Sequence, residues 1–309
     1  MQSVTVEADL SDAFLDRVKA AYRRALAATK PAGGQWAAID ERRADVHAAL
    51  LASDNEALRA IFIDPTTTDL YYGVDRLCRS YVRLNQASEF IFEALNVADP
   101  RARCAAYQIE RLREINPTAL SAVEIGPGMG RAAYYGHLAG LDYTTIDLPL
   151  GIVAQACFLG RALSPDALWF AGEDEAVLGG RIKLLYSAPD RQFDIALNVD
   201  SITEMPSEVA FDYFRWAAKN AKHLLSINHE KNRFTVTQLA SFSAPNKVIA
   251  RRACPVWDGY IEEAFSLCGP GTLPPWSRLA AFETFIFAGR VARGIARRWR
   301  PFRQLGRLT

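Results

Sequence analysis

Paired cysteines, charge of one sign and a long apolar run are all missing from this chain of 309 residues. Its five cysteines are odd in number and widely spaced, with no C-x-x-C pair, which argues against a disulfide framework or a zinc ribbon. The 36 basic and 35 acidic residues nearly cancel, so no global field attracts nucleic acid. No run of about 18 apolar residues suits a membrane span, and no signal peptide is visible. We therefore expect a cytoplasmic protein that binds no nucleic acid.

The first 115 residues carry helical patterns and few strand signals. Between residues 9 and 28 apolar side chains recur every four positions, from Leu10 through Phe14 to Leu26, which predicts a helix with one buried stripe. We expect residues 1–115 to form a helical N-terminal section that serves as a substrate lid, as the interface of a homodimer, or as both. Its helices are predicted at 9–28, 37–61, 76–98 and 99–115.

From Ser121 the pattern changes to short apolar runs that alternate with helical segments. This alternation predicts an α/β fold, a Rossmann-like, doubly wound and mostly parallel sheet, over residues 116–290. The helices are predicted around 130–140, 150–163, 207–222 and Asp258–Leu267. The strands are predicted at Ala122–Ile125, Tyr143–Ile146, Ala167–Phe170, Ile182–Tyr186, Phe193–Leu197, Leu224–Ile227, Lys247–Ala253 and Phe282–Ala288.

A glycine-rich turn, in the stretch VEIGPGMGR, joins the first predicted strand to the helix after it. Such a turn lets the backbone come close to a ligand. Dinucleotide folds need a small third residue in G-x-G-x-x-G/A, and here that position is Arg131. The pattern that is present is E-x-G-x-G-x-G, formed by Glu124, Gly126, Gly128 and Gly130.

This pattern resembles motif I of the class I S-adenosylmethionine-dependent methyltransferases. The resemblance implies that the loop passes under the methionine part of the cofactor and that an acid ending the second strand binds the ribose. Asp147 stands at that place, followed by Leu148, and a carboxylate can accept two hydrogen bonds from a diol. Asn198 is a further expected cofactor contact. For the adenine we consider Glu173, or alternatively the pair Tyr186 and Ser187, and favour Glu173.

Several later segments resemble a bacterial family of sugar O-methyltransferases. They are IDLPLGIVAQACFLGRAL, FDIALNVDSITEMP, LLSINHEKN, the stretch LYYGVDRL and the arrangement P-x-W…Y-x-E-E-x-F. The resemblance implies transfer of a methyl group from S-adenosylmethionine to a hydroxyl of a sugar or oligosaccharide. Two alternatives stay open: a non-sugar acceptor, phenolic or polyketide, and a non-catalytic cofactor-binding adaptor at a membrane surface.

Polar residues follow two neighbouring predicted strands, as expected at the open edge of a parallel sheet. His229 is the first candidate for the base that deprotonates the acceptor, because its ordinary pKa lies near neutrality. Asp200 is the second candidate, and Glu204 is grouped with them. Asp200, Glu204 and His229 are also ligand types for a divalent ion such as Mg²⁺, so metal dependence stays open. Expected acceptor contacts are Ser201, Glu230, Tyr71, Tyr72, Asp75 and Arg76.

The C-terminal tail, residues 291–309, is basic. From Arg290 to Thr309 the chain has seven arginines and no acid, interleaved with apolar residues. Such a segment can make peripheral contact with an anionic membrane surface. A solvated helix that packs its apolar face on the domain is the alternative that we prefer.

Overall fold

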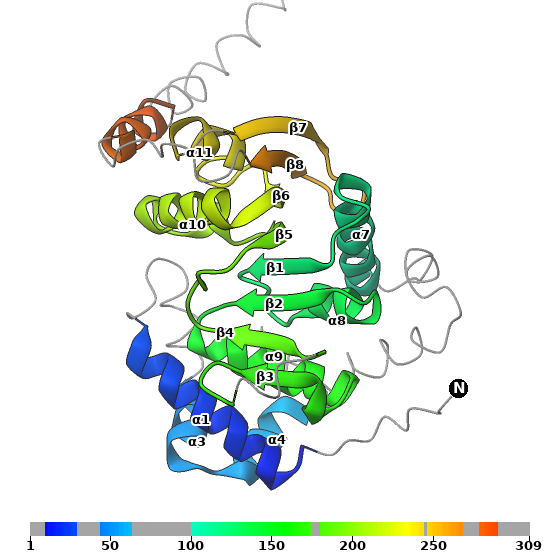
Figure 1. The fold of residues 1–309 in the computed structure, drawn as a ribbon. Helices are drawn as coiled ribbons and strands as arrows, with labels where there is room; N and C mark the ends of the chain where they lie inside the picture. The colour runs from blue at the N-terminus through cyan, green and yellow to red at the C-terminus, as the bar shows by residue number, and fades with distance from the viewer. Residues whose placement is uncertain are drawn as a thin grey trace, which may run out of the picture.

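The computed structural model describes residues 10–29, 44–63, 100–174, 180–243, 246–267 and 278–289. They form one eight-stranded sheet in the order β3-β4-β2-β1-β5-β6-β8-β7 (Figure 1). Neighbouring strands from β3 to β6 are parallel, and β8 pairs antiparallel with both β6 and β7. The strands are β1 Ser121–Ile125, β2 Asp142–Ile146, β3 Leu168–Phe170, β4 Ile182–Leu185, β5 Phe193–Val199, β6 Ala221–His229, β7 Asn246–Ala253 and β8 Tyr260–Leu267.

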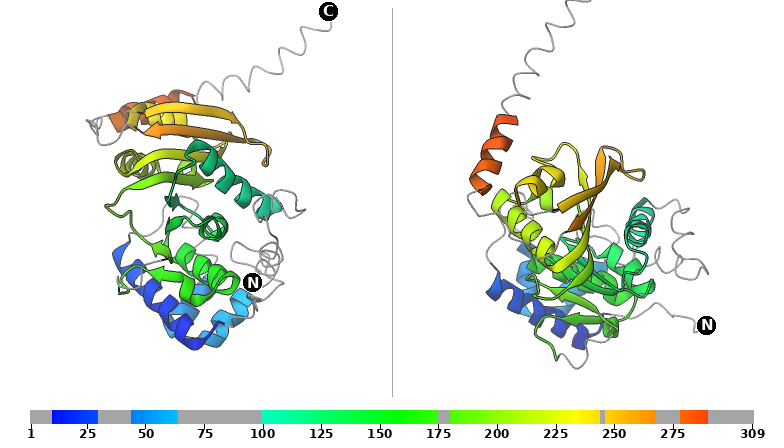
Figure 2. Two further views of the ribbon diagram at one scale, coloured as in Figure 1. Left: turned by 45° about the vertical axis from the view of Figure 1, so that its right-hand side comes forward. Right: turned by 45° about the horizontal axis from the view of Figure 1, so that its top comes forward.

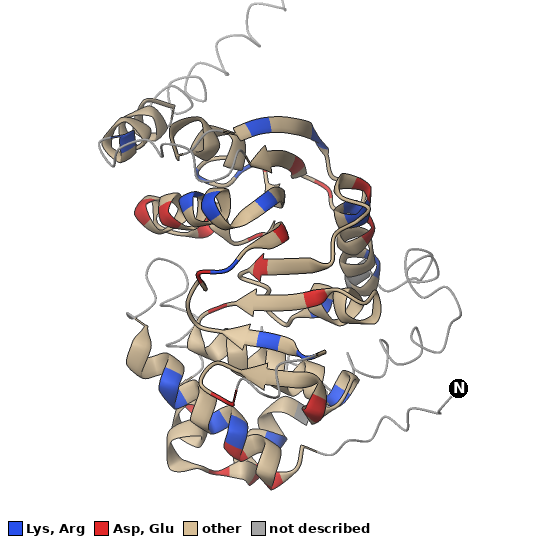
Figure 3. Ribbon diagram, in the orientation of Figure 1, with Lys and Arg blue, Asp and Glu red and all other residues tan. Residues whose placement is uncertain are grey.

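Helices cover both faces of the sheet, which confirms the predicted α/β fold (Figures 1 and 2). On one face lie α7 (Pro100–Ile115), α8 (Arg131–Leu138) and α9 (Pro149–Ala162). On the other lie α10 (Ser207–Asn220), α11 (Val236–Ser243) and the helix over 278–289. The central strands read as nearly continuous apolar runs because both of their faces are buried. Charges of both signs lie side by side along α1 and α10 (Figure 3).

The described N-terminal helices extend the sheet at its β3 edge. They are α1 (Asp12–Ala28), α3 (Ala44–Ala52) and α4 (Asn55–Ile63). Phe14 of α1 packs on Phe170 of β3, with ring centroids 6.4 Å apart, and on the surface of α9 at Gly160. The three helices share one hydrophobic cluster with α9 and the sheet. The roles of lid and dimer interface stay predictions.

Two predicted elements near the C-terminal end are wrong. Asp258–Leu267, predicted as a helix, is the strand β8. Its consecutive acids Glu262 and Glu263 are both buried, at 0 % and 2 % exposure. They bind partners on different elements, Arg111 of α7 and the first turn of α11. A strand permits this because successive side chains point to opposite faces.

The second error concerns Phe282–Ala288, which was predicted as a strand and lies within a helix over 278–289. Phe282 and Ile286, four residues apart, are buried, whereas Phe285 and Phe287 are exposed. The run of aromatic and β-branched residues favoured a strand, but the burial follows the helical period. Phe282 packs edge to face on Phe234. None of the helices in the described ranges is long and apolar enough to cross a bilayer.

Candidate functional site

The carboxyl ends of four parallel strands meet at one edge of the sheet. Ile125 of β1 pairs in register with Ile146 of β2 and with Asn198 of β5, and Asn198 pairs with Ser226 of β6. The residues that follow these strands therefore gather at one place, where ligands of open α/β sheets bind. Backbone hydrogen bonds continue the alignment, from Gly126 N to Ile146 O at 2.9 Å and from Asp200 N to Ile227 O at 3.0 Å.

The glycine loop between β1 and α8 follows a path that other residues cannot take easily. Gly126, Gly128 and Gly130 have φ values of +67°, +59° and +76°, in the left-handed region that glycine enters without steric cost. A Cβ on Gly126 would lie 2.5 Å from Ser201 Cβ, so β1 and the loop after β5 touch through backbone. The loop thus exposes main-chain groups at the sheet edge, as a ligand cradle requires.

Asp147 lies against this loop, where the sequence predicted it. Its Oδ1 accepts a hydrogen bond from Leu148 N at 2.7 Å, and its Oδ2 accepts bonds from Gly128 N at 3.2 Å and Gln155 Nε2 at 2.8 Å. Burial raises the pKa of Asp147 to about 7, although all three hydrogen bonds lower it. Leu148 precedes the first turn of α9 and contributes its backbone amide, not its side chain, to this arrangement.

Gln155 is a residue of the site that the sequence interpretation missed. Its side chain is completely buried in α9, and its Oε1 lies 2.7 Å from the hydroxyl of Thr145. The signal was present, since a glutamine among the apolar residues of IVAQACFLG would be costly to bury without hydrogen-bond partners. The identity of those partners depends on how α9 packs on β2.

Glu124, predicted as a cofactor contact, does not reach the open edge. It is 3 % exposed, and its Oε2 accepts a hydrogen bond of 2.9 Å from the Tyr143 hydroxyl. Burial raises the pKa of Glu124 to about 8, with a smaller contribution from the charge of Asp147. Its carboxyl group is therefore part of the packed interior beneath the loop.

Asn198 and Ser201 form an internal network instead of a ligand surface. Asn198 Nδ2 donates to Ile125 O at 3.1 Å and also contacts Ser201 Oγ, while Ser201 Oγ donates to Ile125 O at 2.7 Å. Asn228 Nδ2 donates to Asn198 Oδ1 at 2.8 Å. Asn198 is 0 % and Ser201 3 % exposed, so their polar atoms join the ends of β1, β5 and β6 and are not open to the predicted cofactor or acceptor. A fully satisfied polar network of this kind gives the edge a single geometry.

Asp200 stands next to this network and has a free acceptor atom. Its Oδ2 accepts a hydrogen bond of 2.8 Å from the Tyr260 hydroxyl, and its buried Oδ1 has no hydrogen-bond partner among the residues that the structure describes. Asp200 has φ +50°, an uncommon value for a residue other than glycine. Tyr260 packs on Trp257 at 4.9 Å and on His229 at 5.0 Å between ring centroids. Burial and the bond to Asp200 raise the pKa of Tyr260, which keeps its hydroxyl a donor.

His229 is oriented in a way that does not suit a base. Its Nδ1 accepts a hydrogen bond of 3.0 Å from Lys231 N, which uses the single lone pair of a neutral imidazole. Nε2 then carries the proton and can only donate. Gly259 lies against the imidazole ring, since a Cβ added to it would be 3.1 Å from Nε2. His229 can therefore bind an acceptor oxygen, whereas Asp200 Oδ1 is the atom that can take its proton.

Glu204 and Glu230 lie on either side of this group. Glu204 ends a short 3-10 turn, Ile202–Glu204, is half-buried, and its charge contributes to the raised pKa of Tyr260. Glu230 is exposed, and its backbone N donates to Gly259 O at 2.8 Å. No group of three or more His, Cys, Asp or Glu side chains that could hold a metal ion is found within the described part of the chain.

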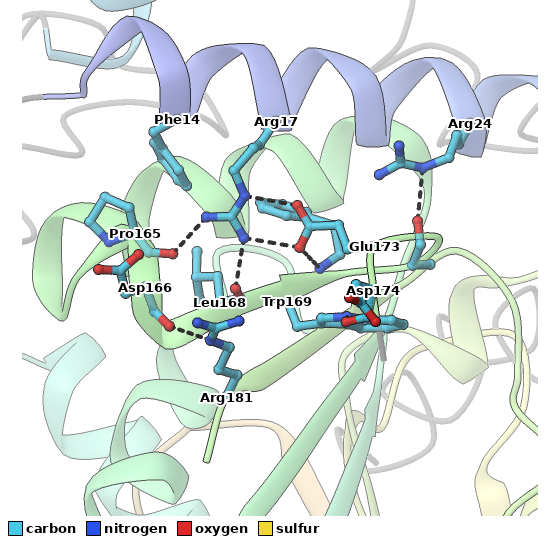
Figure 4. A network of polar contacts seen from close by, with 12 residues as sticks. Phe14, Arg17, Arg24, Pro165, Asp166, Leu168, Trp169, Glu173, Asp174 and Arg181 are labelled. Carbon is cyan, nitrogen blue, oxygen red and sulfur yellow. Dashed lines mark hydrogen bonds and ion pairs between the residues drawn. The ribbon is translucent and has the colours of Figure 1, made fainter. Parts of the chain in front are cut away.

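Glu173, the predicted adenine contact, lies elsewhere. It follows β3, the edge strand, whereas β4 is the neighbour of β2. Arg17 of α1 binds both of its oxygens, at 2.8 Å and 3.0 Å, and Phe170 N donates to it (Figure 4). Burial raises its pKa, but the bonds from Arg17 and Phe170 outweigh this and lower it overall. A polar pocket of ≈ 360 Å³ beside this pair is lined by Arg17, Asp166, Glu173, Asp174 and Arg181.

The alternative adenine contacts, Tyr186 and Ser187, lie nearer to Asp147, and both adenine assignments stay predictions. Tyr186 and Ser187 directly follow β4, whose Leu185 pairs with Ile146 of β2. They stand beside Asp147, whose N donates to Leu185 O at 3.0 Å. The other predicted acceptor contacts, Tyr71, Tyr72, Asp75 and Arg76, lie outside the described residues, as does the tail 291–309.

Comparison with known proteins yields partial structural likenesses. No protein-family model and no curated protein matches the chain. The glycopeptide N-methyltransferase MtfA complexed with S-adenosyl-L-homocysteine is 14% identical over 52% of this chain and 88% of its own, with a TM-score of 0.41. An rRNA methylase from Escherichia coli is 11% identical over 82% and 91%, with a TM-score of 0.40.

Magnesium protoporphyrin IX methyltransferase from Synechocystis PCC 6803, with bound SAM, is 13% identical over 66% of this chain and 100% of its own, with a TM-score of 0.37. At these identities and TM-scores the likenesses carry no conclusion about the activity of this chain. The functional proposal below therefore depends on the glycine loop, Asp147 and Asp200.

Proposed function

We propose that the protein is an S-adenosylmethionine-dependent O-methyltransferase that acts on a hydroxyl of a sugar or oligosaccharide. The observation that carries the proposal is the placement of two carboxylates at one sheet edge. Asp147 lies against the glycine loop after β1, and Asp200, with its free Oδ1, follows β5 on the other side of β1. One carboxylate suits a ribose diol and the other an acceptor hydroxyl.

The residues around the loop fit the cofactor. The loop of the E-x-G-x-G-x-G pattern is exposed at Gly128 and half-buried at Gly126, and Asp147 presents carboxylate oxygens beside it. Carboxylates bind vicinal hydroxyls side by side, and Tyr186 and Ser187 follow the next strand, where an adenine would reach. When bound, S-adenosylmethionine supplies an electrophilic methyl group on a sulfonium.

Asp200 supplies the proton acceptor that an alcohol needs. Oδ1 is closed to solvent in this structure, so an acceptor hydroxyl must displace a neighbouring group to reach it, and the hydroxyl would then pass its proton to that atom. Tyr260 holds the other carboxylate oxygen at 2.8 Å, which orients Oδ1. His229 Nε2–H can bind a second oxygen of the acceptor, so that the reacting hydroxyl is aligned before transfer.

Two features support a sugar as the acceptor. Polar donors and acceptors, from His229, Asp200 and Glu204, stand close to the half-buried rings of Trp257 and Tyr260. The hydroxyls of a sugar can bind the polar side chains, and its weakly polar face can pack on the aromatic rings. The sequence resemblance to sugar O-methyltransferases agrees with this reading. A phenolic acceptor would use the same rings, and a labelled-cofactor screen of sugars, oligosaccharides and phenols separates the two classes.

The decisive experiment compares Asp200→Asn with His229→Asn. We expect Asp200→Asn to lower kcat by about 100-fold or more, because a positioned base contributes 10²–10⁴-fold. His229→Asn keeps an acceptor for Lys231 N and should retain turnover within about tenfold. In both variants S-adenosylhomocysteine should still raise the Tm. No Tm shift in the wild type would overturn the cofactor assignment, and full activity of Asp200→Asn would overturn the assignment of the base.

Metal dependence is measured in the same assay. Turnover in EDTA against turnover in added Mg²⁺ separates a metal-assisted acceptor site from the carboxylate base described here. We expect the EDTA-treated enzyme to retain its activity, because Asp200 alone provides an acceptor for the proton.

A further inference from the structure

One amide side chain interrupts the apolar interior of α9. Every residue from Leu150 to Gly160 of this helix is buried, and Gln155 is 0 % exposed. A buried amide without hydrogen-bond partners is strongly unfavourable. Its two polar atoms are nevertheless both bonded, and the bonds lead to Asp147.

The hydrogen bonds form a directed chain from β2 to the loop. The Thr145 hydroxyl lies 2.7 Å from Gln155 Oε1 and 3.3 Å from the Lys183 carbonyl. Oε1 can only accept, so the amide is oriented with Nε2 toward Asp147 Oδ2, 2.8 Å away. Thr145 therefore sets the orientation of Gln155, and Gln155 sets the orientation of the carboxylate.

Close packing keeps this unit in place. A Cβ on Gly130 would lie 3.2 Å from Gln155 Cγ, and a Cβ on Gly151 would overlap the carboxyl group of Asp147. The last glycine of the loop thus rests on Gln155, and the first turn of α9 rests on Asp147. Both side chains therefore pack against backbone at positions where a residue larger than glycine would push on them.

Counting acceptor sites shows which bond a diol can replace. An ionised carboxylate has about four lone-pair sites. Leu148 N takes one on Oδ1, and Gly128 N and Gln155 Nε2 take two on Oδ2. A diol needs two sites, so one donor of this chain must yield. The bond from Gly128 N is the longest, at 3.2 Å, and it comes from the exposed loop, whereas Gln155 is locked in the core.

We propose that Gln155, oriented by Thr145, is a positioning residue that holds the Asp147 carboxylate in the plane needed to bind the cofactor ribose, while the Gly128 amide is the contact that exchanges for a ribose hydroxyl. This inference rests on the proposed function, and it concerns selectivity for the ribose. Gln155 acts through Asp147 and does not touch the cofactor.

The test compares dissociation constants for S-adenosylhomocysteine and its 2′-deoxy and 3′-deoxy analogues by calorimetry. In the wild type, removal of a hydroxyl that binds a carboxylate should weaken binding about tenfold or more. In Gln155→Met, which preserves the volume of the side chain, the penalty should fall below about threefold, because the carboxylate is no longer oriented. A generally weakened fold would change all three dissociation constants together and leave their ratios intact.

Thr145→Val is the second variant, since it removes only the donor to Gln155 Oε1 and keeps a β-branched side chain in β2. We expect the loss of affinity on removal of a ribose hydroxyl to lie between the losses in the wild type and in Gln155→Met. The far-UV spectrum should be unchanged. Unchanged ratios in both folded variants would overturn the positioning role and leave the cofactor site standing. If Gln155→Met does not fold, an unchanged ratio in Thr145→Val overturns the role alone. Absence of any S-adenosylhomocysteine binding by the wild type would overturn the proposed function itself.

Discussion

Two carboxyl groups beneath the glycine loop differ in what they touch. Asp147 receives three hydrogen bonds at the sheet edge, whereas Glu124 receives one, from Tyr143, in the interior. Burial is the main cause that raises the pKa of both, to about 7 for Asp147 and about 8 for Glu124. Glu124 is therefore mostly protonated at neutral pH, as a buried carboxyl with one neutral partner should be.

The stability of the protein should consequently fall as pH rises. A carboxyl whose folded pKa is raised binds its proton more tightly in the folded state, so its contribution is complete below the unfolded pKa, about 4.3. Between the unfolded pKa and pH 8 the free energy of unfolding falls, by about 1.4 kcal/mol for each pH unit and each such group. The side chain introduced by Glu124→Gln cannot ionise, so the free energy of unfolding of this variant should fall less steeply with pH. The variant should be more stable than the wild type at pH 8.

Urea unfolding at pH 5, 6.5 and 8 checks this expectation. The Gln amide oxygen still accepts from Tyr143, so the variant should resemble the wild type at pH 5. Glu208→Gln, at an exposed position of α10, is the matched control and should keep the wild-type slope. A slope for Glu124→Gln equal to that of the wild type would show that Glu124 is already ionised in the folded protein.

At the scale of elements, β8 joins the two helical layers through consecutive glutamates. Glu262 accepts bonds from Arg111 Nη2 at 2.8 Å and from Arg252 Nε at 3.1 Å, and it also contacts Tyr107. The bonds link α7 to the β7–β8 hairpin. Arg111 is itself only 8 % exposed, so this is a buried ion pair.

Glu263 faces the opposite layer. It accepts bonds from Val236 N at 2.9 Å and Thr237 N at 3.2 Å, the first amides of α11, and from Arg251 Nε at 3.2 Å. A carboxylate at a helix N-terminus satisfies amides that have no partner within the helix and favours the helix dipole. The two acids therefore hold α7 and α11 against one strand.

Loss of either glutamate should destabilise the protein, by different amounts. Glu262→Ala leaves a buried guanidinium without its inner carboxylate and should lower the free energy of unfolding by about 3 kcal/mol or more. Glu263→Ala removes a helix cap and should cost about 1–2 kcal/mol. Urea unfolding of the two variants measures the difference. A smaller loss for Glu262→Ala than for Glu263→Ala would indicate that water or Glu114 compensates Arg111.

At the scale of the whole molecule, the described N-terminal helices and the sheet share one core. Leu10, Phe14 and Leu50 belong to the same hydrophobic cluster as Leu159 and Leu184. Arg17 donates two hydrogen bonds to Glu173, which lies 156 positions away in the chain. A unit with one core should unfold in one step.

We therefore expect deletion of residues 1–63 to prevent folding of the remainder. The deletion exposes the apolar surface of α9 and β3 that α1 covers, including Phe170. For the full chain, circular dichroism and tryptophan fluorescence should report one coincident urea transition. A soluble 64–309 fragment with its own cooperative transition would contradict this expectation.

The sequence by itself determined the features that depend on neighbouring residues. Short apolar runs that alternate with helical segments predicted the parallel sheet. Three glycines in alternating positions, with Asp147 at the end of the next strand, predicted the place of the loop. These are local preferences of backbone and burial pattern, so a short stretch of chain carries them. The polar residues after β5 and β6 were found for the same reason.

Only the tertiary structure decided what each of those side chains touches. Asn198 and Ser201 bind the backbone of β1 in the interior, and Glu173 pairs with Arg17. His229 Nδ1 accepts a hydrogen bond from Lys231 N, and Gln155 donates one to Asp147. The strand β8 and the helix over 278–289 were predicted wrongly for a related reason, since burial on a strand face and on a helix stripe look alike in short runs. Hydrogen-bond partners and buried faces arise from residues far apart in the chain, which no local pattern contains.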